Sequence, residues 1–127
     1  MIKAKGLVIS RWQEHLDTLA FTLHDYGCET YGVLRWQDGL ELCRTCDLNL
    51  LVYDDMMQDL RAWQFAYKYL QNEPANRPYM VAMTDLDSRQ QRCLCEECGF
   101  DEYVVKPIEL STLLMWVQKA RDRALLN

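Results

Sequence analysis

Glycine and proline are scarce in this sequence, with 5 Gly and 3 Pro among 127 residues. Collagen-like chains and Pro/Gly-rich disordered chains need far more of both, so those classes are excluded. Half of the residues are hydrophobic, which is enough to build a buried core in a chain of this length. We therefore expect one globular domain over residues 1–127.

The sequence also lacks an excess of basic residues and a long hydrophobic run. Its formal net charge is −5, so the overall basic charge typical of nucleic-acid-binding domains is missing. The first apolar stretch, residues 6–9, is too short for the hydrophobic segment of a secretory signal or for a membrane span. We therefore expect a cytoplasmic domain that makes no direct contact with nucleic acid or with a membrane.

Cysteine, in contrast, is abundant. The six cysteines are Cys28, Cys43, Cys46, Cys93, Cys95 and Cys98. In the cytosol such thiols are usually reduced. The spacings Cys-x-x-Cys at 43–46 and Cys-x-Cys-x-x-Cys at 93–98 could together supply four thiolates to zinc. Two groups can share one ion only if they lie on neighbouring elements, so the fold decides between a metal site and ordinary packing.

Short apolar runs alternate along the chain with segments of helical periodicity. The apolar runs end at polar breaks and predict strands over residues 5–9, 28–34, 48–53, 79–83 and 103–105. The segments between them repeat apolar residues every three or four positions, which predicts helices over residues 13–26, 36–46, 59–70, 88–98 and 109–125. This alternation predicts an α/β domain, with a doubly wound parallel sheet covered by helices on both faces.

The same periodicity predicts which helical residues face the sheet. In helix 59–70 these are Leu60, Trp63, Ala66, Tyr67 and Leu70. In helix 109–125 they are Leu110, Leu113, Leu114 and Val117. Ser88 or Asp87 is expected to cap helix 88–98.

Polar side chains stand where four of the predicted strands end. They are Ser10 and Arg11 after the first strand, Asp54 and Asp55 after the third, Thr84 and Asp85 after the fourth, and Lys106 after the fifth. The carboxyl ends of parallel strands meet at one edge of the sheet, where the functional crevice of such folds lies. A carboxylate, a hydroxyl and an ammonium group together suit a phosphoryl group. The carboxylate can act as nucleophile while the other two offset the charge of the phosphoryl oxygens.

These residues, in this order, resemble the receiver domains of two-component response regulators over essentially the whole chain. Asp54-Asp55-Met56-Met57 is similar to the family's Asp-x-Met-Met segment after the third strand. Lys106-Pro107 resembles its Lys-Pro pair after the fifth strand, and Tyr103 stands where the family often has an aromatic residue. The resemblance implies a CheY-like fold, a (βα)5 domain with strand order 2-1-3-4-5.

The resemblance also implies a role for each residue. Asp54 would accept a phosphoryl group from a histidine kinase or a phosphotransfer protein, while Thr84 and Lys106 would bind its oxygens. Tyr103 would turn inward as Thr84 moves toward the phosphoryl group. Such a domain is a phosphoacceptor in a phosphorelay and not a conventional enzyme.

The output of such a domain is a change at its surface. The resemblance places that change on helix 88–98, strand 103–105 and helix 109–125, and the same surface could form a homodimer.

The acid pocket departs from the family pattern. Receivers normally carry two adjacent acids after the first strand, and these hold Mg²⁺ with the phosphoacceptor and a main-chain carbonyl, here Asp54 and Met56. This sequence has Ser10 and Arg11 instead. A hydroxyl is a poor substitute for a carboxylate, and an arginine repels a cation. We therefore expect weak Mg²⁺ binding at most, with Arg11 able to pair with Asp54 in place of the metal.

Two alternatives to phosphoryl acceptance stay open. The domain could be a pseudo-receiver, an interaction module of the same fold that needs no phosphorylation. A thiol-based metal or redox sensor is the less favoured alternative. In the receiver order, helix 59–70 lies between the two cysteine groups, so we expect no zinc and interpret these thiols as packing residues.

Overall fold

The computed structural model describes residues 3–57 and 59–126, and strands alternate with helices throughout. The strands are β1 (Ala4–Ile9), β2 (Cys28–Val33), β3 (Leu50–Asp54), β4 (Tyr79–Thr84) and β5 (Glu102–Val105). The helices are α1 (Gln13–Asp25), α2 (Trp36–Thr45), α3 (Ala62–Leu70), α4 (Arg89–Cys98) and α5 (Leu110–Leu126). Each element expected from the sequence is present, with ends that differ by a few residues.

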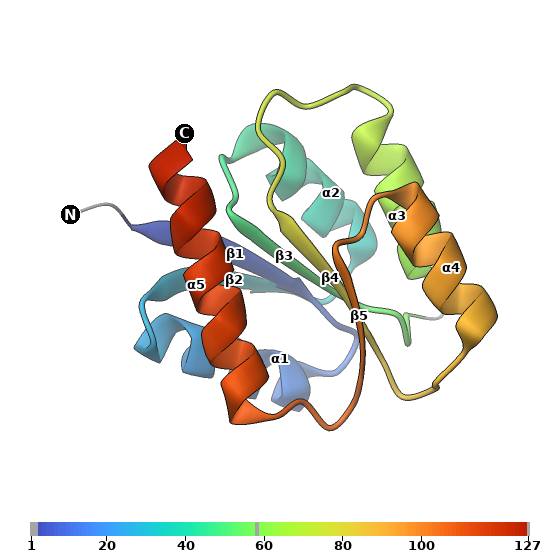
Figure 1. Ribbon diagram of the computed structural model, residues 1–127, viewed down its shortest axis with the longest axis horizontal. Helices are drawn as coiled ribbons and strands as arrows, with labels where there is room; N and C mark the ends of the chain where they lie inside the picture. The colour runs from blue at the N-terminus through green and yellow to red at the C-terminus, as the bar shows by residue number, and fades with distance from the viewer. Residues whose placement is uncertain (1–2, 58, 127) are drawn as a thin grey trace.

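The five strands form one parallel sheet with the order β2-β1-β3-β4-β5. Helices α1 and α5 cover one face, and α2, α3 and α4 cover the other (Figure 1). The predicted fold class and strand order are therefore confirmed. None of the helices in the described part of the chain is both long enough and apolar enough to span a bilayer.

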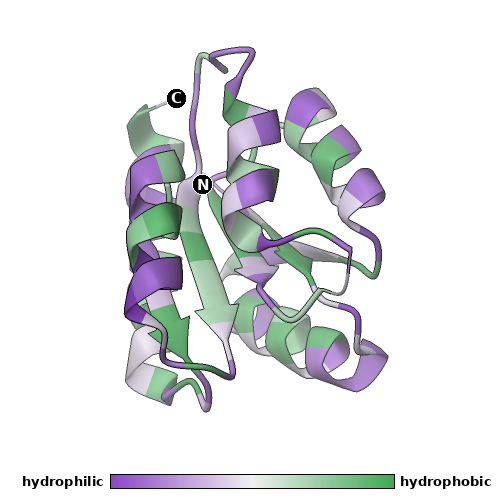
Figure 2. Cartoon of the chain, turned by 90° about the vertical axis from the view of Figure 1, so that its right-hand side faces the viewer, coloured by the Kyte–Doolittle hydropathy of each residue, from purple (hydrophilic) through white to green (hydrophobic). Residues whose placement is uncertain are grey.

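The sheet separates two hydrophobic cores. Tyr53 and Phe65 lie at the centre of the core under α2, α3 and α4, whereas Leu23 and Trp116 fill the core under α1 and α5. Because both faces are covered, β3 is buried along its whole length. Figure 2 shows apolar strands enclosed by helices that carry both polar and apolar residues.

Helix α3 begins later than the sequence predicts and faces the sheet with different residues. Its buried residues include Phe65, Ala66 and Tyr69, whereas Tyr67 is 60% exposed. The sequence prediction counted Leu60 as part of the helical stripe. Leu60 is buried, but it lies in the loop before the helix, so its inclusion shifted the phase of the stripe.

Helix α5 also differs from the prediction in its inward face. Its buried residues are Leu113, Trp116, Val117 and Ala120. Leu110 and Leu114 were expected to face inward, yet they are 52% and 43% exposed. At 3.6 residues per turn, both lie to one side of the buried stripe.

Helix α4 starts as expected. The side chain of Ser88 accepts a hydrogen bond from the backbone N–H of Gln91 at 3.2 Å, which satisfies one of the free donors at the helix start.

Candidate functional site

The carboxyl edge of the sheet brings together polar residues from four strand ends. Asp54 is the last residue of β3, between β1 and β4. Ser10 directly follows β1 and Thr84 ends β4, so both flank Asp54. Lys106 follows β5, and its backbone N–H donates to the carbonyl of Thr84 at 2.7 Å. The structure thus brings Asp54, Ser10 and Lys106 into contact, with Thr84 on the neighbouring strand.

The Asp54 carboxylate is fully buried and has a polar partner on each oxygen. Its Oδ2 accepts hydrogen bonds from Lys106 Nζ at 2.8 Å and from Ser10 Oγ at 3.1 Å. Its Oδ1 accepts from the backbone N–H of Met56 at 3.1 Å. The Lys106 side chain is only 17% exposed, so solvent screens this ion pair weakly. The charge of Asp54 is offset within the protein itself.

Lys106 is held in place from two further sides. Its Nζ lies 3.5 Å from Asp85 Oδ1 and 5.4 Å from the centre of the Trp12 ring. An ammonium group over an aromatic face gains a cation–π attraction. Trp12 therefore borders the pocket and helps to hold Lys106 in place.

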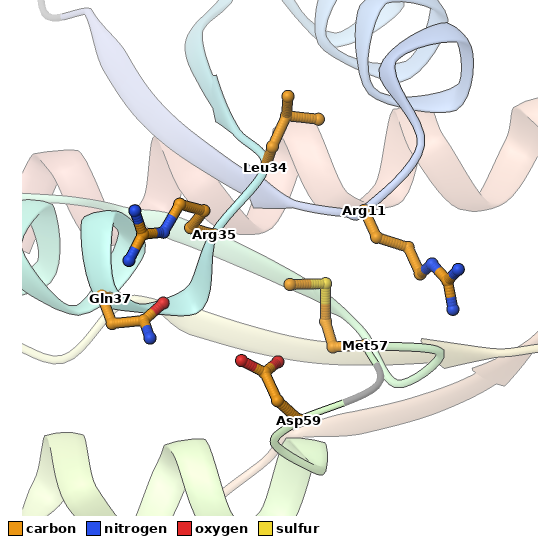
Figure 3. Close-up of a pocket in the computed structure, with 6 residues that line it drawn as sticks. All are labelled: Arg11, Leu34, Arg35, Gln37, Met57 and Asp59. Atoms are coloured by element: carbon orange, nitrogen blue, oxygen red, sulfur yellow. The ribbon is translucent and has the colours of Figure 1, made fainter.

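Arg11 lies beside the pocket, with its guanidinium carbon 4.7 Å from the centre of the Trp12 ring. The sequence allowed Arg11 to pair with Asp54 in place of the metal; the bonds that the structure shows on Asp54 Oδ2 come from Lys106 and Ser10. Arg11 also lines a hollow of about 340 Å³ on the β2 side, with Leu34, Arg35, Gln37, Met57 and Asp59. Its side chain points away from the other five (Figure 3).

The residues of this pocket do not fit Mg²⁺. Magnesium requires oxygen ligands in near-octahedral geometry, with one or two carboxylates. The oxygens of Asp54 already accept hydrogen bonds, and the Ser10 hydroxyl donates to one of them. Ser10 stands where a second carboxylate would be needed, and the nearby Asp85 lies 3.5 Å from the Lys106 ammonium group. Among residues 3–57 and 59–126, no group of three or more His, Cys, Asp or Glu could hold a metal ion.

Thr84 and Tyr103 meet at the backbone of Leu86. Thr84 Oγ1 accepts a hydrogen bond from the N–H of Leu86 at 3.2 Å, and the Tyr103 hydroxyl donates to the carbonyl of Leu86 at 3.1 Å. Tyr103 is 5% exposed, and burial raises the pKa of its hydroxyl. The aromatic residue is therefore already turned inward while Asp54 is paired with Lys106.

Arg92 is a site residue that the sequence did not reveal. Its guanidinium lies over the Tyr103 ring, 4.8 Å from the centre, and its Nη1 donates to the carbonyl of Tyr103 at 3.0 Å. An arginine on the polar side of an amphipathic helix gives no signal of such a contact, because the partner lies on a strand that follows the helix.

Asp55 is the second residue whose role was missed. Its carboxylate accepts two hydrogen bonds from Arg61, at 3.1 and 2.7 Å, and one from the N–H of Ala62 at 2.7 Å. The hydrogen bond from Arg61 raises the pKa of that guanidinium. Asp55, the residue after β3, thus caps the start of α3 and connects the two elements. Capping patterns search the residues next to the helix, so they do not find a cap seven residues away.

The cysteines lie on separate helices, as the receiver order predicts. Cys43 and Cys46 belong to α2 or its end, and Cys93, Cys95 and Cys98 belong to α4. Helix α3 runs between them (Figure 1). Cys43 and Cys95 are buried, and burial raises the pKa of each thiol to about 12. The arrangement favours packing over a shared metal site.

Comparison with curated proteins gives a partial match in sequence. No protein-family model matches the chain. The transcriptional regulatory protein CusR of Escherichia coli K12 is 31% identical over 90 residues, which cover 71% of this chain and 37% of CusR. The match thus spans just over a third of the length of the curated relatives.

Solved structures match the chain over nearly its full length. A response regulator receiver domain from Clostridium thermocellum has a TM-score of 0.84 at 22% identity, covering 97% of this chain and 98% of its own. A CheY-like receiver domain from Methanospirillum hungatei JF-1 has a TM-score of 0.85 at 19% identity, with 98% and 99% covered. This chain has the CheY-like receiver fold. Vibrio cholerae CheY4 shares the receiver fold with a TM-score of 0.83 at 19% identity, covering 93% of this chain and 98% of its own.

Within the receiver fold, the candidate site lies at the carboxyl edge of the sheet. The order 2-1-3-4-5 changes direction between β1 and β3, and folds of this kind bind ligands at that point. Ser10 and Asp54 lie on its two sides and are hydrogen-bonded to each other.

Proposed function

We propose that this chain is a receiver-type signalling module that acts through contacts with protein partners. In this module, neighbouring protein groups stabilise the buried Asp54 carboxylate without Mg²⁺. The observation that carries this proposal is the buried Asp54 carboxylate, with Lys106 and Ser10 on one oxygen and the Met56 N–H on the other. Lys106 belongs to the receiver pattern itself, whereas Ser10 stands where a receiver carries a metal-binding acid, and its hydroxyl donates to Asp54. A receiver fold whose pocket is satisfied internally suits an interaction module that needs no phosphorylation.

The partners of such a module are proteins of a two-component pathway. The receiver fold supports a histidine kinase or a phosphotransfer protein as the partner class. The surface formed by α4, β5 and α5 is the proposed contact, and a homodimer through the same surface is part of this proposal. The exposed apolar residues Leu110, Leu114 and Met115 on α5 support it.

Phosphoryl acceptance at Asp54 is the second candidate function. It is favoured by one observation, the placement of Lys106 Nζ 2.8 Å from Asp54 Oδ2 beside the buried hydroxyl of Thr84. In this reaction a carboxylate oxygen of Asp54 would attack the phosphorus of a phosphohistidine. The new O–P bond would form as the P–N bond breaks, and the electron pair would return to the imidazole nitrogen.

A phosphodonor experiment separates the two candidates. The protein is incubated with acetyl phosphate, with and without Mg²⁺, and its intact mass is measured against Asp54→Asn under the same conditions. The interaction module predicts an unchanged mass in every sample. If the wild type gains the mass of one phosphoryl group and Asp54→Asn does not, phosphoryl acceptance is the function, and the phosphorylation-independent module is wrong.

A further inference from the structure

Tyr103 is held at its hydroxyl, at its ring and at its backbone carbonyl. Its hydroxyl donates to the carbonyl of Leu86 at 3.1 Å. Its own carbonyl accepts a hydrogen bond from Arg92 Nη1 at 3.0 Å, and the Arg92 guanidinium lies 4.8 Å from the ring centre. Tyr103 thus lies between the loop after β4 and the first turn of α4, and it is 5% exposed.

Arg92 itself is held in position by local structure. Its backbone N–H donates to the carbonyl of Ser88 at 2.9 Å, and Ser88 caps the helix. Its Nη2 lies 3.6 Å from Asp87 Oδ1, although both side chains are partly exposed, so this ion pair contributes little. The guanidinium is therefore placed over the ring mainly by the start of α4 and by its hydrogen bond to β5.

The inward position of Tyr103 occurs together with the Lys106–Asp54 ion pair. Thr84 Oγ1 accepts from the N–H of Leu86 at 3.2 Å, while Lys106 Nζ stays on Asp54. An outward rotation of Tyr103 would break the bond to Leu86 and move the ring out from under a planar cation. Arg92 opposes that rotation from outside the pocket.

We propose that Arg92 is a clamp that holds Tyr103 inward, so that the surface of α4, β5 and α5 keeps one conformation whatever the state of Asp54. This inference rests on the receiver-type function proposed above, and it supplies the regulation of that surface. An arginine is suited to the task because its planar group stacks on an aromatic ring while its N–H groups bond a carbonyl. A lysine could keep the charge, but it would lose the planar stack.

The test measures how accessible Tyr103 is to nitration by tetranitromethane, with peptide mass spectrometry to assign the modified residue. Wild type is compared with Arg92→Ala, Arg92→Lys and Arg89→Ala, which removes an exposed arginine from the same helix. Far-UV circular dichroism reports whether each variant folds. If Arg92→Ala does not fold, Arg92→Lys carries the test.

The clamp predicts that Tyr103 is protected in wild type and in Arg89→Ala. Nitration should become several-fold faster in Arg92→Ala and rise to an intermediate rate in Arg92→Lys. Equal protection of Tyr103 in wild type and in the folded Arg92 variants would overturn the clamp. Because the assay needs neither a partner nor a phosphodonor, that result would leave the outcome of the acetyl phosphate experiment unaffected, and the two failures can be told apart.

Discussion

Lys106 Nζ lies 2.8 Å from Oδ2 of Asp54, and the carboxylate it neutralises is fully buried. The two residues come from the ends of β5 and β3, which β4 separates in the sheet. A buried carboxylate is unstable without a partner. This ion pair therefore links the chemistry of the pocket to the stability of the fold.

Removal of the ammonium group should destabilise the domain strongly. Lys106→Met leaves the Asp54 charge buried with only hydrogen bonds from Ser10 and Met56, and we expect a loss of about 3 kcal/mol in the free energy of unfolding. Urea denaturation measures it. Lys5→Met, at an exposed position on β1, serves as the control and should stay within about 0.5 kcal/mol of wild type.

The double variant Asp54→Asn with Lys106→Met tests whether the unpaired charge of Asp54 causes this loss of stability. It should be less destabilised than the sum of the two single variants, because no charge is left unpaired. Additive losses would show that the ion pair is not responsible.

Asp55 should matter for stability through α3 and not through the pocket. Asp55→Ala removes the cap on Ala62 and the paired bonds from Arg61, and we expect a loss of about 3 kcal/mol. Asp55→Asn should cost about half as much, since its amide oxygen can still accept from Ala62. Urea denaturation gives the totals, and hydrogen exchange of the first turn of α3 locates the effect. If hydrogen exchange in the first turn of α3 is no faster in Asp55→Ala than in the exposed control Asp17→Asn, the capping role is wrong.

The sequence predicted the parts of the site that local patterns encode. Asp54, Thr84 and Lys106 stand at strand ends, and parallel strands place such residues at one edge without any knowledge of side-chain geometry. The contacts of Asp55 with Ala62 and of Arg92 with Tyr103 depend on how a loop or a helix packs, which periodicity does not contain. The wrong inward face predicted for α3 has the same origin. Leu60 is buried although it lies in a loop, so in the sequence it resembles a helical core residue.

The cysteines should differ widely in reactivity toward a disulfide reagent at pH 8. Cys93 is exposed and should react first, followed by Cys46 and Cys98. Cys28, Cys43 and Cys95 are buried, so they should react only after unfolding. Cys93→Ser should remove the fast phase and leave the others unchanged.

Metal analysis of protein purified without chelators should find no stoichiometric zinc; one zinc per chain would contradict the packing role.

Alkaline pH should weaken the fold. Burial raises the pKa of Cys28 from 9.0 to about 11 and that of Cys43 and Cys95 to about 12. Because the unfolded chain releases these protons first, the stability from the buried neutral thiols is complete below pH 9 and is lost as the pH rises toward 12. Urea midpoints measured from pH 7 upward should fall above pH 9. Cys43→Ala with Cys95→Ala should flatten that fall, and an unchanged slope would count against the thiols as its source.

The central claim is that the Asp54 pocket is satisfied by Lys106 and Ser10 and does not take up Mg²⁺. Fluorine NMR of the protein with beryllofluoride, a phosphoryl analogue, and Mg²⁺ tests it most directly. The account predicts no bound fluoride resonance in wild type and a bound resonance in Ser10→Asp with Arg11→Asp, which restores the two acids. A magnesium-dependent bound resonance in wild type, lost in Asp54→Asn, would contradict it.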